Sequence, residues 1–166
     1  ILEELSTAPD AAAGEARYWL ALSRLRTDRP GAAEEAFRGL LREYPESRFA
    51  PDARLRLGEL LYARGDHSEA VSVLRPLLDG SSPQRSEALY LSALAHRALG
   101  DPTRTETELR RLIDDYPGSP LASQARLRLG ELALERGNYN IAQTQANAVL
   151  AERTDELAAE AHYMAG

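Results

Sequence analysis

One eight-residue string occurs twice in this chain, and this repetition constrains the fold more than any other feature. Ala-Arg-Leu-Arg-Leu-Gly-Glu-Leu occupies residues 53–60 and recurs at residues 125–132, 72 residues later. The match continues on both sides, from Tyr44 to Ala70 and from Tyr116 to Ala142. Self-similarity at a fixed spacing indicates an array of units, because a unit that cannot bury its apolar face alone must cover it with a neighbour.

Weaker copies show that the 72-residue offset contains two units. Five anchor alanines are spaced by 37, 35, 37 and 36 residues: Ala16, Ala53, Ala88, Ala125 and Ala161. We expect complete units at residues 10–45, 46–82, 83–117 and 118–153, with the end of a preceding unit at 1–9 and the start of a fifth at 154–166. Because the chain begins inside an incomplete unit, we expect it to be part of a longer protein.

Each unit is predicted to contain two helices. Ala53, Leu57 and Leu61 recur at helical spacing, and Gly65-Asp66 then supplies a helix end and a cap for the next helix. A second apolar stripe follows, and proline ends the second helix at three places. These are Tyr44-Pro45, Ser82-Pro83 and Tyr116-Pro117. We predict about nine helices and no strands, because no segment shows the alternation typical of strands.

Small residues recur at one position of each helix. Ala21, Gly58, Ala93 and Gly130 share a position in the first helices, and Ala33, Ala70 and Ala142 share one in the second helices. We expect the two helices of a hairpin to approach closely there. Three residues depart from the pattern: Thr105 replaces the second-helix alanine, and Arg24 and His96 stand at a position that usually holds a large apolar residue.

These repeats resemble the tetratricopeptide repeat family. The matching elements are Leu57-Gly58 and its copy Leu129-Gly130, Gly65-Asp66, Ala70, Leu74 and the closing Pro45. The resemblance covers nearly the whole chain. It implies an all-α, right-handed α-solenoid of helical hairpins, in which the first helices line a concave groove that binds a segment of another protein.

A narrower resemblance concerns the string Tyr-Pro-x-Ser followed by Ala-x-x-x-Leu-Gly, at Tyr44 to Gly58 and Tyr116 to Gly130. It is similar to the repeats of bacterial cell-envelope scaffolds, the periplasmic Tol-Pal accessory protein and the outer-membrane-assembly lipoprotein. This implies a periplasmic or outer-membrane-associated protein. The absence of cysteine fits the cytoplasm equally well.

The resemblance also assigns residues to the groove. The partner-binding residues that it implies are Glu15, Tyr18, Leu22, Asp52, Leu55, Glu59, Tyr62, Glu87, Tyr90, Leu94, Arg97, Gln124, Leu127, Glu131, Leu134 and Tyr163. Acids outnumber Arg97 on this track, which favours a basic partner segment. The alternative is that its tyrosines and leucines fill contacts between units while the acids are a solvated rim. For Trp19 we favour packing against a neighbouring hairpin over a role as a binding anchor.

No catalytic or metal-binding pattern is present in the sequence. The chain lacks cysteine, and His67, His96 and His162 lie in different units without ligand spacing. Glu34-Glu35 and Asp114-Asp115 are sequence neighbours, so their carboxylates point in different directions on a helix. We therefore expect no catalysis, no metal and no cofactor.

The charge narrows the class of partner. The net charge is −6, which disfavours nucleic acid, and no apolar run is long enough to insert into a membrane. A non-enzymatic protein-protein interaction scaffold is the first hypothesis. The alternatives are a helical accessory domain of a cell-wall-processing enzyme and a structural module that self-associates through its repeat ends.

Overall fold

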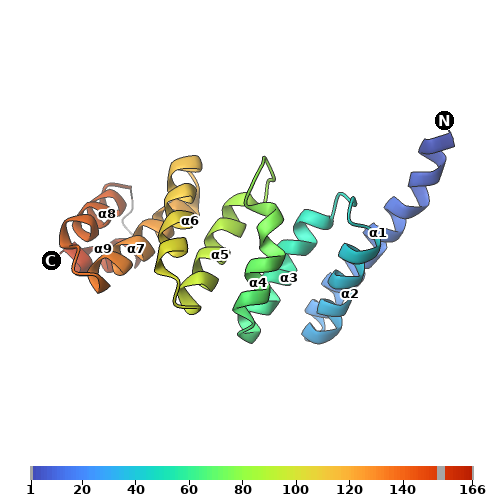
Figure 1. Ribbon diagram of the computed structural model, residues 1–166, viewed down its shortest axis with the longest axis horizontal. Helices are drawn as coiled ribbons and strands as arrows, with labels where there is room; N and C mark the ends of the chain where they lie inside the picture. The colour runs from blue at the N-terminus through green and yellow to red at the C-terminus, as the bar shows by residue number, and fades with distance from the viewer. Residues whose placement is uncertain (1, 153–155, 166) are drawn as a thin grey trace. The chain divides into compact units, whose positions relative to one another are not determined.

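The computed structural model describes the backbone of residues 2–152 and 156–165, and the side chains of residues 12–151 and 157–165. All regular structure in these residues is helical (Figure 1). The α-helices are α1 (Leu2–Arg26), α2 (Pro30–Glu43), α3 (Ala50–Arg64), α4 (His67–Leu74), α5 (Arg85–Ala98), α6 (Pro102–Asp115), α7 (Pro120–Glu135), α8 (Tyr139–Glu152) and α9 (Glu156–Ala165). A short 3-10 helix, η1 (Arg75–Leu77), follows α4. The prediction of an all-helical chain is confirmed.

The chain divides into two compact parts, which we call the first half (residues 1–84) and the second half (residues 85–166). In the first half α1 packs on α2, α2 on α3, and α3 on α4. In the second half α5 packs on α6, α6 on α7, α7 on α8, and both α7 and α8 on α9. Each half is therefore a run of antiparallel hairpins in which a second helix also contacts the first helix of the next hairpin.

The loops inside the hairpins follow the predicted glycine pattern. Gly65, Gly100 and Gly137 have φ angles of 93°, 72° and 71°, a left-handed conformation that ends a helix with little strain in glycine. In the first hairpin Asp28 occupies the equivalent position with φ 54°. The prediction that an acid or amide caps the following helix holds for Asp101, whose side chain accepts from the Arg104 amide at 3.0 Å. It is wrong for Asp66, because that carboxylate pairs with Arg64 instead.

Two element boundaries differ from the sequence prediction. The helix α1 begins at Leu2 and passes through residue 9, so residues 2–9, assigned to the end of a preceding unit, belong to the same helix as the start of the first unit. The helix α4 ends at Leu74, well before Ser82-Pro83. Pro76 lacks an amide hydrogen, and the chain tightens there into η1. Leu77 and Leu78, which follow this point, are nevertheless buried.

The small residues lie where helices approach closely, but not always within one hairpin. A Cβ on Gly58 would stand 2.7 Å from Cδ2 of Leu74, in the second helix of the same hairpin. A Cβ on Gly130 would instead meet Sδ of Met164 at 3.1 Å, in the first helix of the next unit. The expectation of a within-hairpin contact is therefore correct for Gly58, while the closest neighbour of Gly130 lies across the inter-unit contact.

The three departures from the repeat are accommodated by hydrogen bonds to carbonyl or carboxylate oxygens. Thr105 is buried, and its Oγ1 donates to the carbonyl of Asp101 at 2.8 Å. Arg24 donates from Nη1 to the carbonyl of Ala32 at 2.8 Å. His96 is buried beside Glu108. These positions keep the hairpins intact because each buried polar group has a partner.

Candidate functional site

The residues predicted to bind a partner lie on the first helices of the hairpins, which are α1 and α3 in the first half and α5, α7 and α9 in the second half. We call their surface the first-helix face of each half. Tyr18, Leu55 and Leu127 are buried and belong to the core. Glu59, Glu87 and Tyr163 are exposed, with Tyr163 90% accessible. The remaining predicted residues are partly buried, and they are Glu15, Leu22, Asp52, Tyr62, Tyr90, Leu94, Arg97, Gln124, Glu131 and Leu134.

An aromatic cluster occupies this face in the first half. The ring of Tyr18 stacks on Phe49 with centroids 4.8 Å apart, and Trp19 meets both rings edge-on. The indole Nε1 of Trp19 donates to Glu15 at 3.2 Å, while the other oxygen of Glu15 pairs with Arg48 at 2.9 Å. Trp19 is still 54% exposed, so packing on its neighbours leaves about half of its surface for contact.

Two of the predicted acids, Glu59 and Glu131, have arginine partners. Arg56 pairs with Glu59 at 3.0 Å, and Arg128 pairs with Glu131 at the repeat-equivalent place. Both pairs join residues three apart on one helix, a spacing that the repeated Arg-Leu-Gly-Glu string already contains. The sequence prediction compared the numbers of acids and arginines but did not use this three-residue spacing.

In the second half Glu131 is the centre of a larger ion-pair network. Arg97 donates to Glu131 and to Glu135, at 2.6 Å each. The hydrogen bond to Glu131 raises the pKa of Arg97. Burial by itself would lower the pKa of Arg128, but the hydrogen bond to Tyr90 and the charges of Glu131 and Glu160 outweigh it, so that pKa is also raised. Both arginines are thus held charged on this face.

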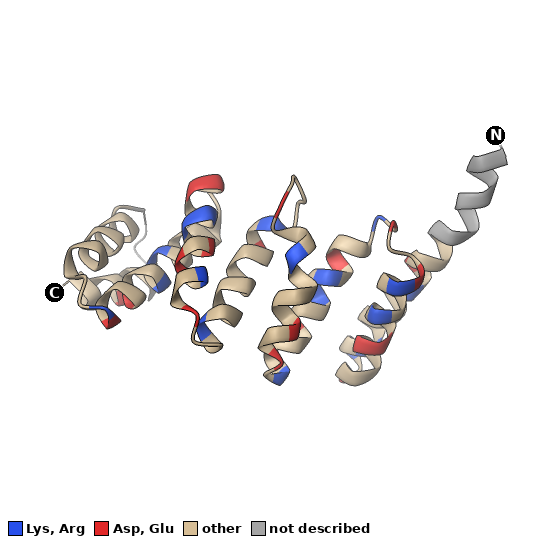
Figure 2. Cartoon of the chain, in the orientation of Figure 1, with Lys and Arg blue, Asp and Glu red and all other residues tan. Residues whose placement is uncertain are grey.

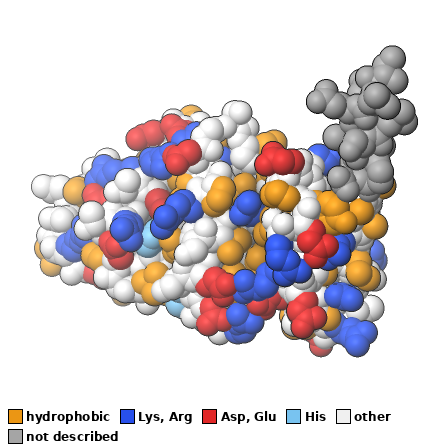
Figure 3. Space-filling model, turned by 45° about the vertical axis from the view of Figure 1, so that its right-hand side comes forward, with side chains coloured by type: hydrophobic (Ala, Val, Ile, Leu, Met, Phe, Trp, Pro, Cys, Tyr) orange, Lys and Arg blue, Asp and Glu red, His pale blue; other side chains and the backbone are white. Residues whose placement is uncertain are grey.

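The resulting electrostatics are mixed rather than uniformly acidic. Basic and acidic residues lie near one another on several helices (Figure 2), and on the face shown in Figure 3 their side chains adjoin one another. Glu87 and Glu160 are exposed on α5 and α9, and Glu59 is exposed on α3. The exposed acids are the groups on the first helices that a basic partner can reach most directly.

A buried polar cluster in the second half went unrecognised in the sequence. His96 Nδ1 lies 3.0 Å from Oε2 of Glu108, and Ser92 Oγ donates to the other carboxylate oxygen at 3.1 Å. The serine bonds to the glutamate and not to the histidine, so the geometry is not that of an activated nucleophile. His67 packs against Tyr62, with ring centroids 5.0 Å apart. Among the described residues, no three potential ligands gather as a metal site.

Known proteins resemble the chain in fold. A tetratricopeptide repeat family model matches residues 2–48, 22–86, 55–120, 90–139 and 127–166. A tetratricopeptide repeat protein from Parabacteroides merdae superposes with a TM-score of 0.81 at 18% identity, over 93% of this chain and 59% of that one. This chain therefore spans less than two thirds of that structure.

Two further structures show the same fold. YrrB, described as a TPR protein with an unusual peptide-binding site, has a TM-score of 0.71 at 19% identity, over 90% of this chain and 72% of its own. MamA from Desulfovibrio magneticus has a TM-score of 0.70 at 19% identity, over 83% of this chain and 74% of its own. No curated protein was found to match the sequence.

The family model matches nearly the entire chain. The structure of this chain agrees with that match, since it has helical hairpins with left-handed glycines at their turns and small residues at close helix contacts. Together with the structural matches they bear out the predicted solenoid of tetratricopeptide-type hairpins. The chain belongs to the tetratricopeptide repeat family.

Proposed function

We propose that the chain is a non-enzymatic scaffold that binds a segment of another protein on its first-helix faces. One observation supports this proposal. The first helices expose a set of side chains on one side, while their opposite sides pack inside the hairpins. Trp19 and Tyr163 offer aromatic surface, and Glu59, Glu87 and Glu160 offer charge. Aromatic contact area with charged residues around it is typical of protein recognition surfaces.

A partner segment that carries Lys or Arg fits these faces best. Arg56, Arg97 and Arg128 are already engaged with glutamates of the chain, so incoming acids would have to compete with Glu59, Glu131 and Glu135. Incoming bases, by contrast, can approach the exposed Glu87 and Glu160. The proposal of a protein partner is also consistent with the description of YrrB, a fold relative, as having a peptide-binding site.

The test compares two triple variants of equal charge. Glu59→Gln, Glu87→Gln and Glu160→Gln remove exposed acids from first helices, whereas the control Glu35→Gln, Glu46→Gln and Asp114→Asn removes exposed acids elsewhere. The probe is a blocked synthetic peptide of alternating arginine and leucine, titrated by fluorescence anisotropy. We expect weaker binding by the first variant only, with a difference that shrinks at high salt.

Equal loss in both variants would show nonspecific attraction to an acidic protein, and no loss in either would exclude the first-helix faces. The set of substituted acids omits Glu131 because this carboxylate holds both Arg97 and Arg128. Removing Glu131 would leave two partly buried arginines without that carboxylate. A loss of peptide binding could then come from a loss of protein stability.

We infer further that the partner belongs to a bacterial cell envelope. Only the Tyr-Pro-x-Ser and Ala-x-x-x-Leu-Gly strings at Tyr44 to Gly58 and Tyr116 to Gly130 support this finer proposal. No helix of the described residues is long and apolar enough to cross a bilayer. Fractionation of cells that express the full-length protein tests the location, and recovery in the cytoplasmic fraction alone would contradict it.

A further inference from the structure

The same ion-pair motif occurs once in each half of the chain. In the first half, Oε1 of Glu34 accepts from Nε and Nη2 of Arg38 at 2.9 Å, and its Oε2 accepts from Nη1 of Arg64 at 2.6 Å. We call Glu34, Arg38 and Arg64 the first clamp. Each clamp joins the second helix of one hairpin to the C-terminal end of the first helix of the next hairpin.

The second clamp consists of Glu106, Arg110 and Arg136, each 72 residues after its counterpart. Oε1 of Glu106 accepts from Nε and Nη2 of Arg110 at 3.2 and 2.8 Å, and Oε2 accepts from Nη1 of Arg136 at 2.7 Å. The same nitrogen atoms meet the same oxygen atoms as in the first clamp.

In the first clamp, two further carboxylates of the chain accept from donor nitrogens that Glu34 does not engage. Nη1 of Arg38 donates to Oε1 of Glu69 at 2.6 Å, and Nε of Arg64 pairs with Asp66. Two arginines thus meet three carboxylates. The hydrogen bond from Arg38 lowers the pKa of Glu69, which keeps this carboxylate ionised in the site.

In the second clamp, the two additional carboxylates are missing. The counterparts of Asp66 and Glu69 are Asn138 and Ile141, neither of which carries a charge. Two arginines meet the single carboxylate of Glu106, and no other acid of the described residues pairs with either of them. Glu106 accepts from Nε and Nη2 of Arg110 but not from Nη1, and the Arg110 side chain is 49% exposed.

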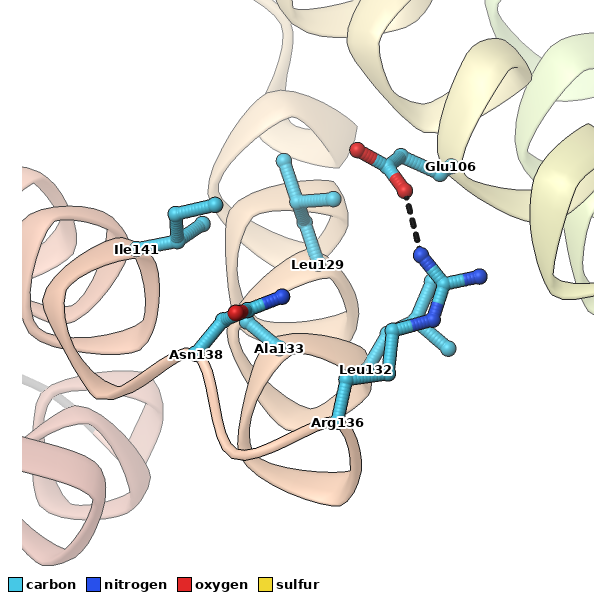
Figure 4. Close-up of a pocket in the computed structure, with 7 residues that line it drawn as sticks. All are labelled: Glu106, Leu129, Leu132, Ala133, Arg136, Asn138 and Ile141. Atoms are coloured by element: carbon cyan, nitrogen blue, oxygen red, sulfur yellow. Dashed lines mark hydrogen bonds and ion pairs between the residues drawn. The ribbon is translucent and has the colours of Figure 1, made fainter.

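A third difference opens space beside the second clamp. The counterpart of Leu61, which is fully buried in the first half, is Ala133. A small pocket lies there between α6, α7 and α8, with Arg136 and Glu106 at one side and Ile141 at the other (Figure 4). Its free volume of about 10 Å³ is enough for one water molecule but not for a large side chain.

We propose that the second clamp binds the carboxylate of an acidic side chain from a partner protein, in the place that Glu69 occupies in the first clamp. Arginine suits this role because its planar fork of donors matches a carboxylate. The first clamp shows the geometry expected of the bound carboxylate, because Glu69 already accepts from Arg38 there. A small apolar group next to the partner's acid would lie against Ile141 and Ala133.

This site is independent of the first-helix faces and takes the opposite charge. The test uses the blocked peptide Ac-Ala-Ala-Glu-Ala-Ala-NH2 and its Glu→Gln counterpart, added to the 15N-labelled full chain at low ionic strength. The Nε–Hε signals of Arg110 and Arg136 report binding. We expect the glutamate peptide to shift these signals with a millimolar dissociation constant, and the glutamine peptide to leave them unchanged.

Three variants sharpen the test. Ile141→Glu supplies the missing carboxylate and should weaken peptide binding roughly ten-fold or more, equivalent to about 1.4 kcal/mol. Ile141→Gln, its uncharged control, should bind like the parent. Glu69→Ile should open the first clamp, so that the peptide also shifts the signals of Arg38.

Equal shifts by the two peptides, or full binding by a folded Ile141→Glu chain, would overturn the proposal. Circular dichroism establishes folding of each variant. If Ile141→Glu does not fold, the Glu69→Ile variant provides the test. An Arg38 Nε–Hε signal that the glutamate peptide does not shift in that variant also contradicts the proposal. Neither outcome depends on whether the first-helix faces bind a basic segment.

Discussion

At the scale of single residues, equivalent glycines have different neighbours. Gly58 and Gly130 share a repeat position, yet Gly58 faces the branched, fully buried Leu74 and Gly130 faces the flexible thioether of Met164. A methyl group at position 58 would stand 2.7 Å from Leu74 Cδ2, and one at position 130 would stand 3.1 Å from Met164 Sδ. The first distance requires repacking, whereas methionine adapts its shape readily.

We expect Gly58→Ala to destabilise the chain by about 1–3 kcal/mol through overpacking, less the gain in helix propensity of about 1 kcal/mol. Gly130→Ala should change the free energy of unfolding by less than about 1 kcal/mol, since Met164 can move and the propensity gain offsets the contact. Urea unfolding of both variants measures the difference. Equal destabilisation would show that Met164 is as rigid as Leu74.

At the scale of helices, the turns of the hairpins determine where helices end. Three of the four hairpin turns have glycine in the left-handed conformation, and the first has Asp28 with φ 54°. An L-residue with a side chain is strained there, although aspartate tolerates it better than most. The contrast between Asp28 and Gly65 isolates this backbone effect at equivalent positions.

Asp28→Gly should therefore raise the free energy of unfolding by about 0.5–1 kcal/mol, because glycine adopts a positive φ without a steric penalty. The reverse substitution, Gly65→Asp, should lower it by a similar amount. Thermal unfolding followed by circular dichroism compares the two. A destabilised Asp28→Gly chain would mean that the aspartate side chain stabilises its turn by more than the strain costs.

At the scale of the whole molecule, arginine–carboxylate pairs connect successive helices in each half. The first and second clamps recur 72 residues apart and use the same atoms. Exposed pairs individually contribute little, about 0–1 kcal/mol. Their collective effect is pH-dependent. The hydrogen bond from Arg38 lowers the pKa of Glu69, and the hydrogen bond from Arg110 lowers the pKa of Glu106, each from 4.5.

A carboxylate with a lowered pKa in the folded state stabilises that state above its unfolded pKa and loses this contribution as pH falls through the folded value. We therefore expect stability to decline below about pH 4.5, and the decline to be shallower in the double variant Glu69→Gln and Glu106→Gln. Urea unfolding across acidic pH measures the slope. An unchanged slope, matching the control Glu35→Gln, would show that these two acids do not carry the effect.

The sequence alone determined the architecture because its signals are local and repeated. Spaced alanines, turn glycines and closing prolines act within a few residues, so they predicted the hairpins and most helix ends. Local signals also predicted that first helices would carry acids and tyrosines. They failed at α4, where Pro76 shortened the helix before the expected proline.

Only the tertiary structure decided which charges meet. Glu34 and Arg64, like Glu106 and Arg136, lie 30 residues apart and come together because one helix packs on the next. His96 and Glu108 meet across a hairpin for the same reason. Packing also buries Tyr18, Leu55 and Leu127, three of the residues predicted to bind a partner. Side-chain partnership and burial depend on helix separation and crossing geometry, which no single-helix pattern specifies.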